Sequence, residues 1–255
     1  MTPLDFAAIA EAASSAADAA RREVLPRFRS VAVETKADGS PVTEADKAAE
    51  RAIRARLRAA FPGFAIHGEE YGADGPGGAP VWLVDPIDGT IAFSRGIPLF
   101  STLIALVEEG EPVFGLIDLP AVGERYVGWR GGGAWRNGEA CRVSQAADLR
   151  RAIVSHGDPF CFERWGASDA FLRMAREIPL LRGYTDAFGH AQVVGGGVGA
   201  MVDLDLNPWD AAATQVLVPE AGGRCVTLQG PGGKLGLVFG SPPLVERLAA
   251  MLEGA

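Results

Sequence analysis

The chain has 255 residues, of which 48% are hydrophobic, and its formal net charge at pH 7 is −8. This length allows a substantial core, whereas the negative charge argues against non-specific binding to nucleic acids or anionic membranes. The three cysteines are widely spaced without a zinc-binding pattern, and we expect neither a signal peptide nor a transmembrane helix. The expected protein is therefore reduced and cytoplasmic.

The first 140 residues predict two helices followed by a mostly antiparallel sheet. Alanine-rich residues 4–25 have apolar side chains at helical spacing, and residues 31–42 are expected to form a loop or short hairpin. Thr43 and Asp46 have the spacing of a capping box that begins a helix through Ala60, whose arginines at 51–58 are expected on an exposed face. The following segments are expected to be a strand at 64–66, a mobile surface loop at 72–80, strands at 81–84, 99–107, 113–118 and 125–129, and a hairpin at 131–138.

The second half of the chain alternates between strand and helix signals. The expected strands are 153–155, 180–184, 202–206, 224–228 and 235–239, and the expected helices are 161–177, 190–201, 208–218 and a final helix that begins at Ser241 and Pro242. This order is not a regular βαβ series and predicts a layered α/β and α+β arrangement. We expect an N-terminal α+β subdomain at 1–140 and a C-terminal α/β subdomain at 141–255.

The segment from Val81 to Thr90 contains the strongest functional signal. An apolar strand leads into Asp85 and Asp88, with Pro86 between them and Gly89-Thr90 after them. Buried carboxylates cost several kcal/mol, roughly, unless a cation or strong hydrogen-bond donors compensate. The two carboxylates and the Ile87 carbonyl are oxygen ligands of the kind that Mg²⁺ prefers. The alternative is an Asx-type turn with surface acids.

Other acids can complete such a site or have simpler roles. Glu69 and Glu70 precede a flexible loop, where an acidic pair can also be merely solvated. Asp210 can be a metal ligand or can simply stabilise the first turn of the helix that Pro208 begins. Asp46 can be only the second half of its capping box, or it can act with Thr90 to activate water. Lys36 can be a solvated loop cation, or it can lie next to a site that binds a phosphate group.

Several residues are expected to be structural. His67, His156 and His190 lack the spacing of metal ligands, and no base lies near Cys141 or Cys161 in the sequence to support thiol catalysis. The run from Gly195 to Gly197 is expected to allow close helix packing rather than to bind a nucleotide.

Four motifs, in order, resemble the inositol monophosphatase superfamily. They are Thr43-Glu44-Ala45-Asp46, Gly68-Glu69-Glu70, Asp85-Pro86-Ile87-Asp88-Gly89-Thr90 and Trp209-Asp210-Ala211-Ala212. The resemblance spans nearly the whole chain. It implies a layered αβαβα sandwich, a homodimer, and Mg²⁺-dependent hydrolysis of small phosphomonoesters, with two or three Mg²⁺ ions per site.

The resemblance also implies a role for each motif residue. Glu69, Asp85 and the Ile87 carbonyl resemble the ligands of the first metal, and Asp85, Asp88 and Asp210 those of the second. Thr90, with Glu69 and Asp46, resembles the water-activating group. The amides of Gly89 and Thr90 resemble a phosphate anchor, so that these two residues, with Asp88 and Asp210, are also expected to contact the substrate.

Substrate choice is suggested by departures from the inositol-specific pattern. The residues after Thr90 are Ile91-Ala92-Phe93, and the stretches Ser94–Phe100, Gly115–Pro120 and Gly123–Arg125 resemble the histidinol-phosphatase branch. Asp203 lies where the family places an acid that touches the substrate, and Asp186 adds a second negative group for a cationic substrate. Solvation at a turn or strand end is the alternative for both.

We therefore predict a histidinol-phosphatase that acts through metal-activated water and without a phosphoenzyme. Alternatives with the same chemistry are the phosphatases of inositol phosphates, of 3′-phosphoadenosine phosphates and of fructose bisphosphate. The alternative of another class is a non-catalytic metal-binding relative. The expected partners are the small phosphomonoester and a second copy of the chain, without nucleic acid or membrane.

Overall fold

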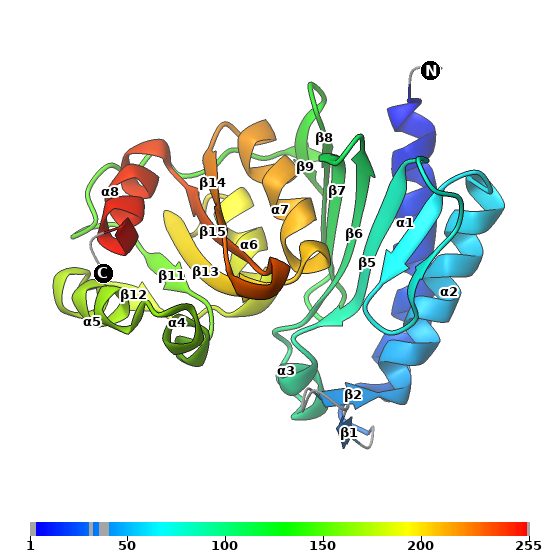
Figure 1. Ribbon diagram of the computed structural model, residues 1–255, viewed down its shortest axis with the longest axis horizontal. Helices are drawn as coiled ribbons and strands as arrows, with labels where there is room; N and C mark the ends of the chain where they lie inside the picture. Colours follow the sequence, from blue (N-terminus) through cyan, green and yellow to red (C-terminus); the bar gives the residue numbers. More distant parts are fainter. Residues whose placement is uncertain (1–3, 31–32, 36–40, 254–255) are drawn as a thin grey trace.

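The computed structural model describes residues 4–30, 33–35 and 41–253, and within these residues two large sheets dominate the fold (Figure 1). The eight-stranded sheet has the order β10-β9-β8-β7-β6-β5-β3-β4, and only its β3–β5 pair is parallel. Its strands are β3 (Ala65–Gly68), β4 (Gly72–Asp74), β5 (Val81–Asp88), β6 (Ser101–Glu108), β7 (Glu111–Leu119), β8 (Glu124–Trp129), β9 (Gly133–Arg136) and β10 (Glu139–Ala140).

Two long helices, α1 (Phe6–Val24) and α2 (Glu44–Ala60), pack side by side on one face of this sheet (Figure 1). Buried alanines on α1, among them Ala13 and Ala16, allow the helices to approach closely. Ile53 of α2 lies in the same cluster as Trp82 and Phe114 of the sheet. Each fully buried apolar side chain contributes roughly 1.5–3 kcal/mol. Short β1 (Val33–Thr35) and β2 (Pro41–Thr43) form an antiparallel pair just before α2.

Helices α6 (Asp186–Val194) and α7 (Pro208–Glu220) lie between the eight-stranded sheet and a five-stranded sheet. The second sheet has the order β12-β11-β13-β15-β14, built from β11 (Val154–His156), β12 (Leu181–Arg182), β13 (Ala200–Leu206), β14 (Arg224–Gln229) and β15 (Leu235–Gly240). Its outer face is covered by α4 (Pro159–Trp165), α5 (Ser168–Glu177) and α8 (Pro242–Glu253). Three short helices, η1 (Leu25–Arg27), α3 (Thr90–Ser94) and η2 (Pro231–Gly233), complete the elements described.

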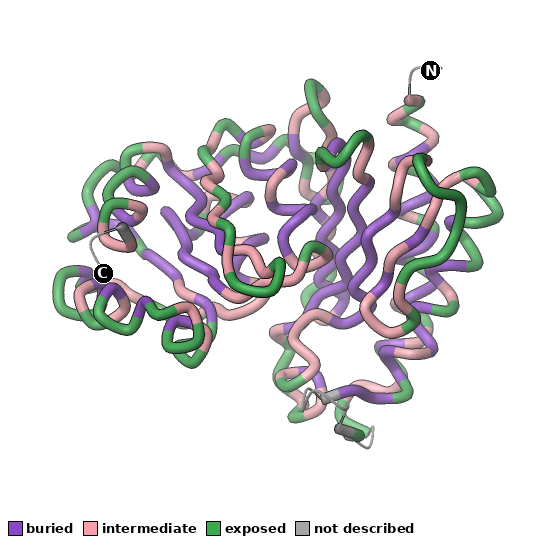
Figure 2. Tube along the Cα trace, in the orientation of Figure 1, coloured by how far each residue is buried: buried purple, intermediate pink, exposed green. Residues whose placement is uncertain are grey.

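The layers therefore alternate as helices, sheet, helices, sheet and helices, which confirms the layered αβαβα arrangement (Figure 1). Figure 2 shows buried residues concentrated along the strands of both sheets and on the inward faces of the helices. The eight-stranded sheet uses residues 65–140 and the five-stranded sheet uses residues 154–240. The separation of the chain into subdomains 1–140 and 141–255 stays a prediction.

Several element predictions were wrong, mainly at glycines. The helix expected at 190–201 ends at Val194, because Gly195–Gly197 turn the chain and Gly196 adopts a φ of 79°. A Cβ on Gly196 would lie 2.6 Å from the Arg142 carbonyl oxygen, so this glycine permits a close backbone approach rather than helix packing.

Other errors concern the bounds of elements. The helix expected at 161–177 is divided into α4 and α5 at Gly166, which has a φ of 80°. Within the loop expected at 72–80, residues Gly72–Asp74 form β4 and pair with β3. The strand at 180–184 has only two paired residues, Leu181 and Arg182, and α3 was not predicted.

Candidate active site

Asp85 and Asp88 lie at the irregular C-terminal end of β5, a strand inside the eight-stranded sheet. The pairing of β5 with β6 shifts in register between these two residues. Pro86 lies inside the shift, has no N–H to donate, and its carbonyl accepts a hydrogen bond of 2.8 Å from the Thr102 hydroxyl. A bulge of this kind redirects side chains at the end of a strand. The motif thus belongs to β5 itself, beyond the expected end of the strand at Val84.

Asp210 reaches the same point from the other half of the chain. Asp85, Asp88 and Asp210 each offer one carboxylate oxygen, and these three atoms lie within 4.8 Å of one another. Asp210 is fixed at the start of α7 because one of its oxygens, Oδ2, accepts a 2.7 Å hydrogen bond from the backbone N–H of Asn207. Asp210 therefore stabilises its helix terminus and also belongs to the acidic cluster, so the two interpretations of this residue are compatible.

The cluster is strongly destabilised as a set of negative charges. Burial, followed by the charges of Glu69, Asp88 and Asp210, raises the pKa of Asp85 well above its ordinary value. Burial also raises the pKa of Asp88 strongly and that of Asp210 to about 7. Among the described residues, no lysine or arginine forms an ion pair with these three acids.

The donor set fits a divalent cation. All three converging ligands are carboxylate oxygens, which suit Mg²⁺, Ca²⁺ or Mn²⁺ rather than softer metals. A bound cation would neutralise the negative charge that these acids bring together. The acidic cluster of Asp85, Asp88 and Asp210 can therefore hold a metal ion.

Glu69 stands beside this cluster on a turn that α2 holds in place. After burial, the charge of Glu69 is the next cause of the raised pKa of Asp85, so the two carboxyl groups lie close together. The turn is fixed by buried Glu50, whose Oε2 accepts a 2.7 Å hydrogen bond from the backbone N–H of Glu70. Arg54 in turn donates to Glu50 Oε1 at 2.7 Å. Arg54 is only 5% exposed, so the expectation that the arginines of 51–58 lie on an exposed face was wrong for this residue.

Thr90 joins Asp46 to the candidate metal-binding segment at the end of β5. The Thr90 hydroxyl lies 3.2 Å from Asp46 Oδ1 and 3.0 Å from the Ile87 carbonyl oxygen. Asp46 Oδ2 accepts from the Thr43 backbone N–H at 2.8 Å. Both interpretations of Asp46 are therefore structurally present, because one oxygen caps α2 and the other contacts Thr90. Burial raises the pKa of Asp46.

Gly89 has the backbone conformation that this turn requires. Its φ is 84°, in the left-handed region that favours glycine. A Cβ at this position would lie 2.9 Å from the Leu99 carbonyl oxygen and 3.2 Å from Asp186 Oδ2. A side chain here would therefore displace residues that line the site. The role of the Gly89 and Thr90 amides as a phosphate anchor stays a prediction.

Two neighbouring cavities open beside the acidic cluster and share Asp158 and Asp186. The first, about 380 Å³, is lined by polar Glu69, Thr90 and Thr185 and by an apolar wall of Ile91, Ala92, Ile97 and Leu99. The second, about 170 Å³, is lined by Asp88, Asp203, Asp205, Asp210 and His190, among others. The structure thus brings Asp186 and Asp203, both predicted from the sequence, close to the candidate metal ligands.

Some residues of the site were not predicted. Asp158 caps α4 by accepting a 2.9 Å hydrogen bond from the Phe160 N–H, and Asp205 pairs with Arg164 at 2.9 Å. Ser101 donates to Asp88 Oδ2 at 3.0 Å. The Asp158-Pro159 pair is a sequence signal for a helix start, but nothing local indicates which cavity that helix faces. Lys36 lies outside the described residues.

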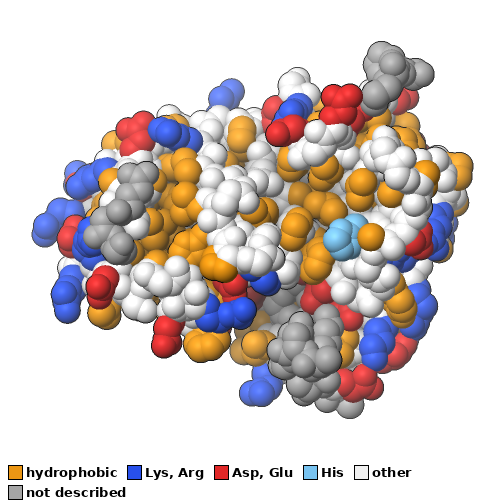
Figure 3. Space-filling model, in the orientation of Figure 1, with side chains coloured by type: hydrophobic (Ala, Val, Ile, Leu, Met, Phe, Trp, Pro, Cys, Tyr) orange, Lys and Arg blue, Asp and Glu red, His pale blue; other side chains and the backbone are white. Residues whose placement is uncertain are grey.

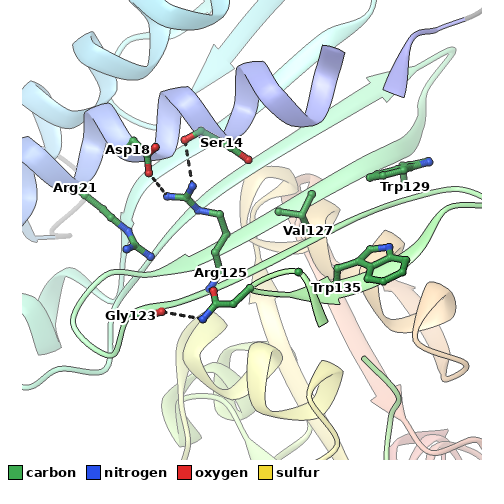
Figure 4. A pocket seen from close by; sticks show the side chains of 10 residues that line it. Ser14, Asp18, Arg21, Gly123, Arg125, Val127, Trp129 and Trp135 are labelled. Carbon is green, nitrogen blue, oxygen red and sulfur yellow. Dashed lines mark hydrogen bonds and ion pairs between the residues drawn. The ribbon is translucent and has the colours of Figure 1, made fainter. Parts of the chain in front are cut away.

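A larger cavity, about 470 Å³, lies away from this site between α1 and the β8–β9 hairpin. Figure 4 shows Arg125 reaching from β8 to Asp18 and Ser14 of α1, with Trp129 and Trp135 farther along the cavity wall. Its charged groups are already paired inside the protein. In the face shown in Figure 3, basic side chains are spread along the margins among acidic ones and form no single broad patch.

The arrangement and the comparisons with known proteins agree on one family. Residues 2–251 match the inositol monophosphatase family. A histidinol-phosphatase of Streptomyces coelicolor is 39% identical over 90% of this chain and 89% of its own length. A fructose-1,6-bisphosphatase/inositol-1-monophosphatase of Thermotoga maritima is 38% identical over 74% of this chain and 72% of its own length.

Solved structures give the same result. The extragenic suppressor protein suhB from Bartonella henselae superposes with a TM-score of 0.88 at 29% identity and covers 96% of this chain and 98% of its own. The chain therefore belongs to the inositol monophosphatase family, a family of metal-dependent enzymes, and it is a phosphoric monoester hydrolase. In the part of the chain that the structure describes, no helix has the length and apolar character needed to span a bilayer.

Proposed function

We propose that this enzyme hydrolyses L-histidinol phosphate, with Mg²⁺ bound by Glu69, Asp85, Asp88, Asp210 and the Ile87 carbonyl. Water attacks phosphorus, the ester P–O bond breaks, and histidinol and inorganic phosphate are released. A bound divalent cation would neutralise phosphate charge and lower the pKa of the attacking water. Two or three Mg²⁺ ions per site, a homodimer and a cytoplasmic location stay predictions.

The observation that carries the choice of substrate is the acidic cavity next to the candidate metal ligands. Asp158, Asp186, Asp203 and Asp205 line this cavity together with Asp88 and Asp210. Histidinol phosphate has an ammonium group close to the ester, and an anionic wall attracts that group. A neutral polyol gains less from such a wall. The name of the relative from Streptomyces coelicolor supports the same choice.

The residues of the chain have separate tasks in this proposal. The Asp46 carboxylate accepts a hydrogen bond from the Thr90 hydroxyl. The Thr90 oxygen can then accept a hydrogen bond from the attacking water and orient it. Glu69, beside Asp85, assists the same water. The left-handed Gly89 allows the backbone at the start of α3 to approach the phosphate.

A direct test compares kcat/KM, in the presence of Mg²⁺, for L-histidinol phosphate, inositol 1-phosphate, 3′-phosphoadenosine 5′-phosphate and fructose 1,6-bisphosphate. We expect L-histidinol phosphate to be preferred by at least about tenfold, the effect of one good charged contact. Equal turnover of all four would contradict the assignment to histidinol phosphate.

The second candidate is the hydrolysis of inositol phosphates or fructose bisphosphate. It is favoured by the Thermotoga maritima relative, whose name includes both activities. The metal-binding acids are the same in both candidates, so only the residues of the two cavities distinguish them. Preference for inositol 1-phosphate in the same assay would select this candidate.

A further inference from the structure

The small acidic cavity has a buried histidine on its wall that the proposed reaction does not use. His190 of α6 is 1% exposed and lines the cavity with Asp203. Its Nε2 lies 3.0 Å from Asp203 Oδ2, and its Nδ1 lies 2.7 Å from the Thr214 hydroxyl. Its ring packs edge-on against Phe239 at 4.7 Å between centroids. Both ring nitrogens therefore have partners, and the ring has little freedom to turn.

The partners fit a neutral ring that carries its proton on Nε2. A carboxylate oxygen only accepts hydrogen bonds, so Nε2 is the donor to Asp203. The Thr214 hydroxyl can donate, which leaves Nδ1 as an acceptor in a neutral ring. In this arrangement Asp203 keeps its negative charge, and His190 orients it without cancelling it.

A second contact fixes Asp203 from the other side. Asp203 is 4% exposed, and its Oδ1 lies beside Gly157, where an added Cβ would be only 1.9 Å away. Only glycine leaves room for the carboxylate there. Asp203 is thus confined by Gly157 on one oxygen and by His190 on the other. Thr214 lies on α7, the helix that also carries Asp210, so one helix orients a metal-binding acid and, through His190, an acid of the substrate cavity.

We propose that His190 is a positioning residue that holds Asp203 as a fixed, negatively charged contact for a cationic group on the alcohol part of the substrate. This inference rests on the proposed function, because it assigns part of the preference for an aminoalkyl phosphate to one hydrogen-bonded unit, Thr214–His190–Asp203. A fixed carboxylate discriminates more strongly than a mobile one, since less ordering is required when the substrate binds.

The test compares a cationic and an uncharged alcohol group on the same variants. KM and kcat are measured with Mg²⁺ for L-histidinol phosphate and for p-nitrophenyl phosphate, which has no group that can donate to Asp203. We expect His190→Leu to raise KM for L-histidinol phosphate by about tenfold with kcat changed less than about threefold. Both constants for p-nitrophenyl phosphate should stay within about twofold of the wild type. His190→Gln should restore much of the KM, because its amide N–H can replace the Nε2 donor.

Two further variants separate positioning from general damage. Gly157→Ala should reproduce the selective rise in KM, because it displaces Asp203 from the opposite side. His156→Gln is the matched control, since His156 contacts the Gly157 carbonyl and aromatic rings rather than Asp203. An unchanged KM for L-histidinol phosphate in His190→Leu, or equal losses on both substrates in folded variants, would overturn the inference.

Failure of the proposed function gives a different result. A wild-type enzyme that hydrolyses p-nitrophenyl phosphate but not L-histidinol phosphate would contradict the proposed substrate. Inhibition of p-nitrophenyl phosphate hydrolysis by L-histidinol, compared with inositol, then tests His190 on its own. Stronger inhibition by the cation that disappears in His190→Leu supports the positioning role, and equal inhibition of the wild type by both compounds overturns it.

The protonation of the ring provides a readout that does not depend on turnover. In a ¹⁵N NMR spectrum of histidine-labelled protein, His190 should show a protonated Nε2 and an unprotonated Nδ1. A doubly protonated ring, or a proton on Nδ1 alone, would contradict the proposed unit, because the first cancels the charge of Asp203 and the second removes the donor.

Discussion

Asp118 and the three acids of the candidate metal site have opposite surroundings in this enzyme. Asp118 of β7 is fully buried, and it accepts hydrogen bonds from Arg21 at 2.6 and 2.7 Å and from Arg125 at 2.7 Å. These arginines also line the cavity between α1 and β8 (Figure 4). Asp85, Asp88 and Asp210 also lie close together, yet among the described residues no arginine or lysine forms an ion pair with them.

The difference distinguishes a structural acid from a candidate metal ligand. Asp118 has its cations within the chain, so the network connects α1 to the sheet and requires nothing further. Burial raises the pKa of all three acids of the site, and the charge of Asp210 adds to the rise for Asp85 and Asp88, so the negative form of the cluster is stabilised by a cation from outside. Burial of an acid therefore says little about function until its counter-charges have been identified.

The largest expected effect is on catalysis when a metal-binding acid is neutralised. Asp88→Asn should lower kcat/KM by about 1,000-fold, or about 4 kcal/mol in activation free energy. Asp88 is within the cluster, so its loss removes a ligand and a negative charge together. Phosphate release with Mg²⁺ measures the effect, and Asp169→Asn, an exposed position on α5, is the matched control. Full activity of Asp88→Asn would contradict the mechanism, because it would show that this carboxylate is not needed for hydrolysis.

The corresponding change at Asp118 should affect stability rather than chemistry. Asp118→Asn leaves Arg21 and Arg125 without their buried counter-charge, and we expect a loss of about 2–3 kcal/mol in the free energy of unfolding. Urea unfolding measures this, and kcat of the folded variant should stay close to the wild-type value. Stability equal to that of the wild type would remove the contrast between Asp118 and the three acids of the site.

The two acids that were predicted with two possible roles show how far the sequence could lead. Asp46 and Asp210 each occupy the third position of a helix, and in both cases one oxygen caps the helix while the residue also reaches the site. A local pattern predicted the cap, and the order of the four motifs predicted the site. The layered fold was also predictable, because apolar periodicity and turn residues mark most of its elements.

The residues that were missed depend on contacts between distant segments. Glu50 supports the turn of Glu69 from a helix, and its only local signal is the arginine four positions later. His190 meets Asp203 across two layers of the fold. Neither contact leaves a spacing that can be recognised along the chain. The helix predicted at 190–201 was wrong because the close approach of Gly196 to Arg142 is tertiary.

A smaller effect is expected when Asp210 is neutralised. Asp210→Asn should weaken the binding of Mg²⁺ by about 10- to 100-fold while the fold is kept. Without metal, the melting temperature should be equal to that of the wild type or slightly higher, since one repulsive charge is removed. Differential scanning calorimetry in EDTA and then in Mg²⁺ measures both effects. A large fall in the melting temperature in EDTA would show that Asp210 is mainly structural.

The smallest effect concerns the pH dependence of the metal-free protein. The pKa of Asp210 is raised to about 7 in the folded state, above its value in the unfolded chain. The folded state then binds more protons than the unfolded state between about pH 4 and pH 7, so stability falls as the pH rises through this range. In EDTA the melting temperature should be higher at pH 5.5 than at pH 7.5. Asp210→Asn should reduce this difference, and a wild-type melting temperature that rises from pH 5.5 to 7.5 would contradict the account.

The most direct test is to locate the cation itself. Crystals grown with Mn²⁺, which shares the oxygen preference of Mg²⁺, should show an anomalous peak within coordination distance of carboxylate oxygens of Asp85, Asp88 and Asp210, and no such peak at Asp118. Absence of a peak among the three acids at saturating Mn²⁺, or a peak held by other residues, would contradict the claim that they form the metal site.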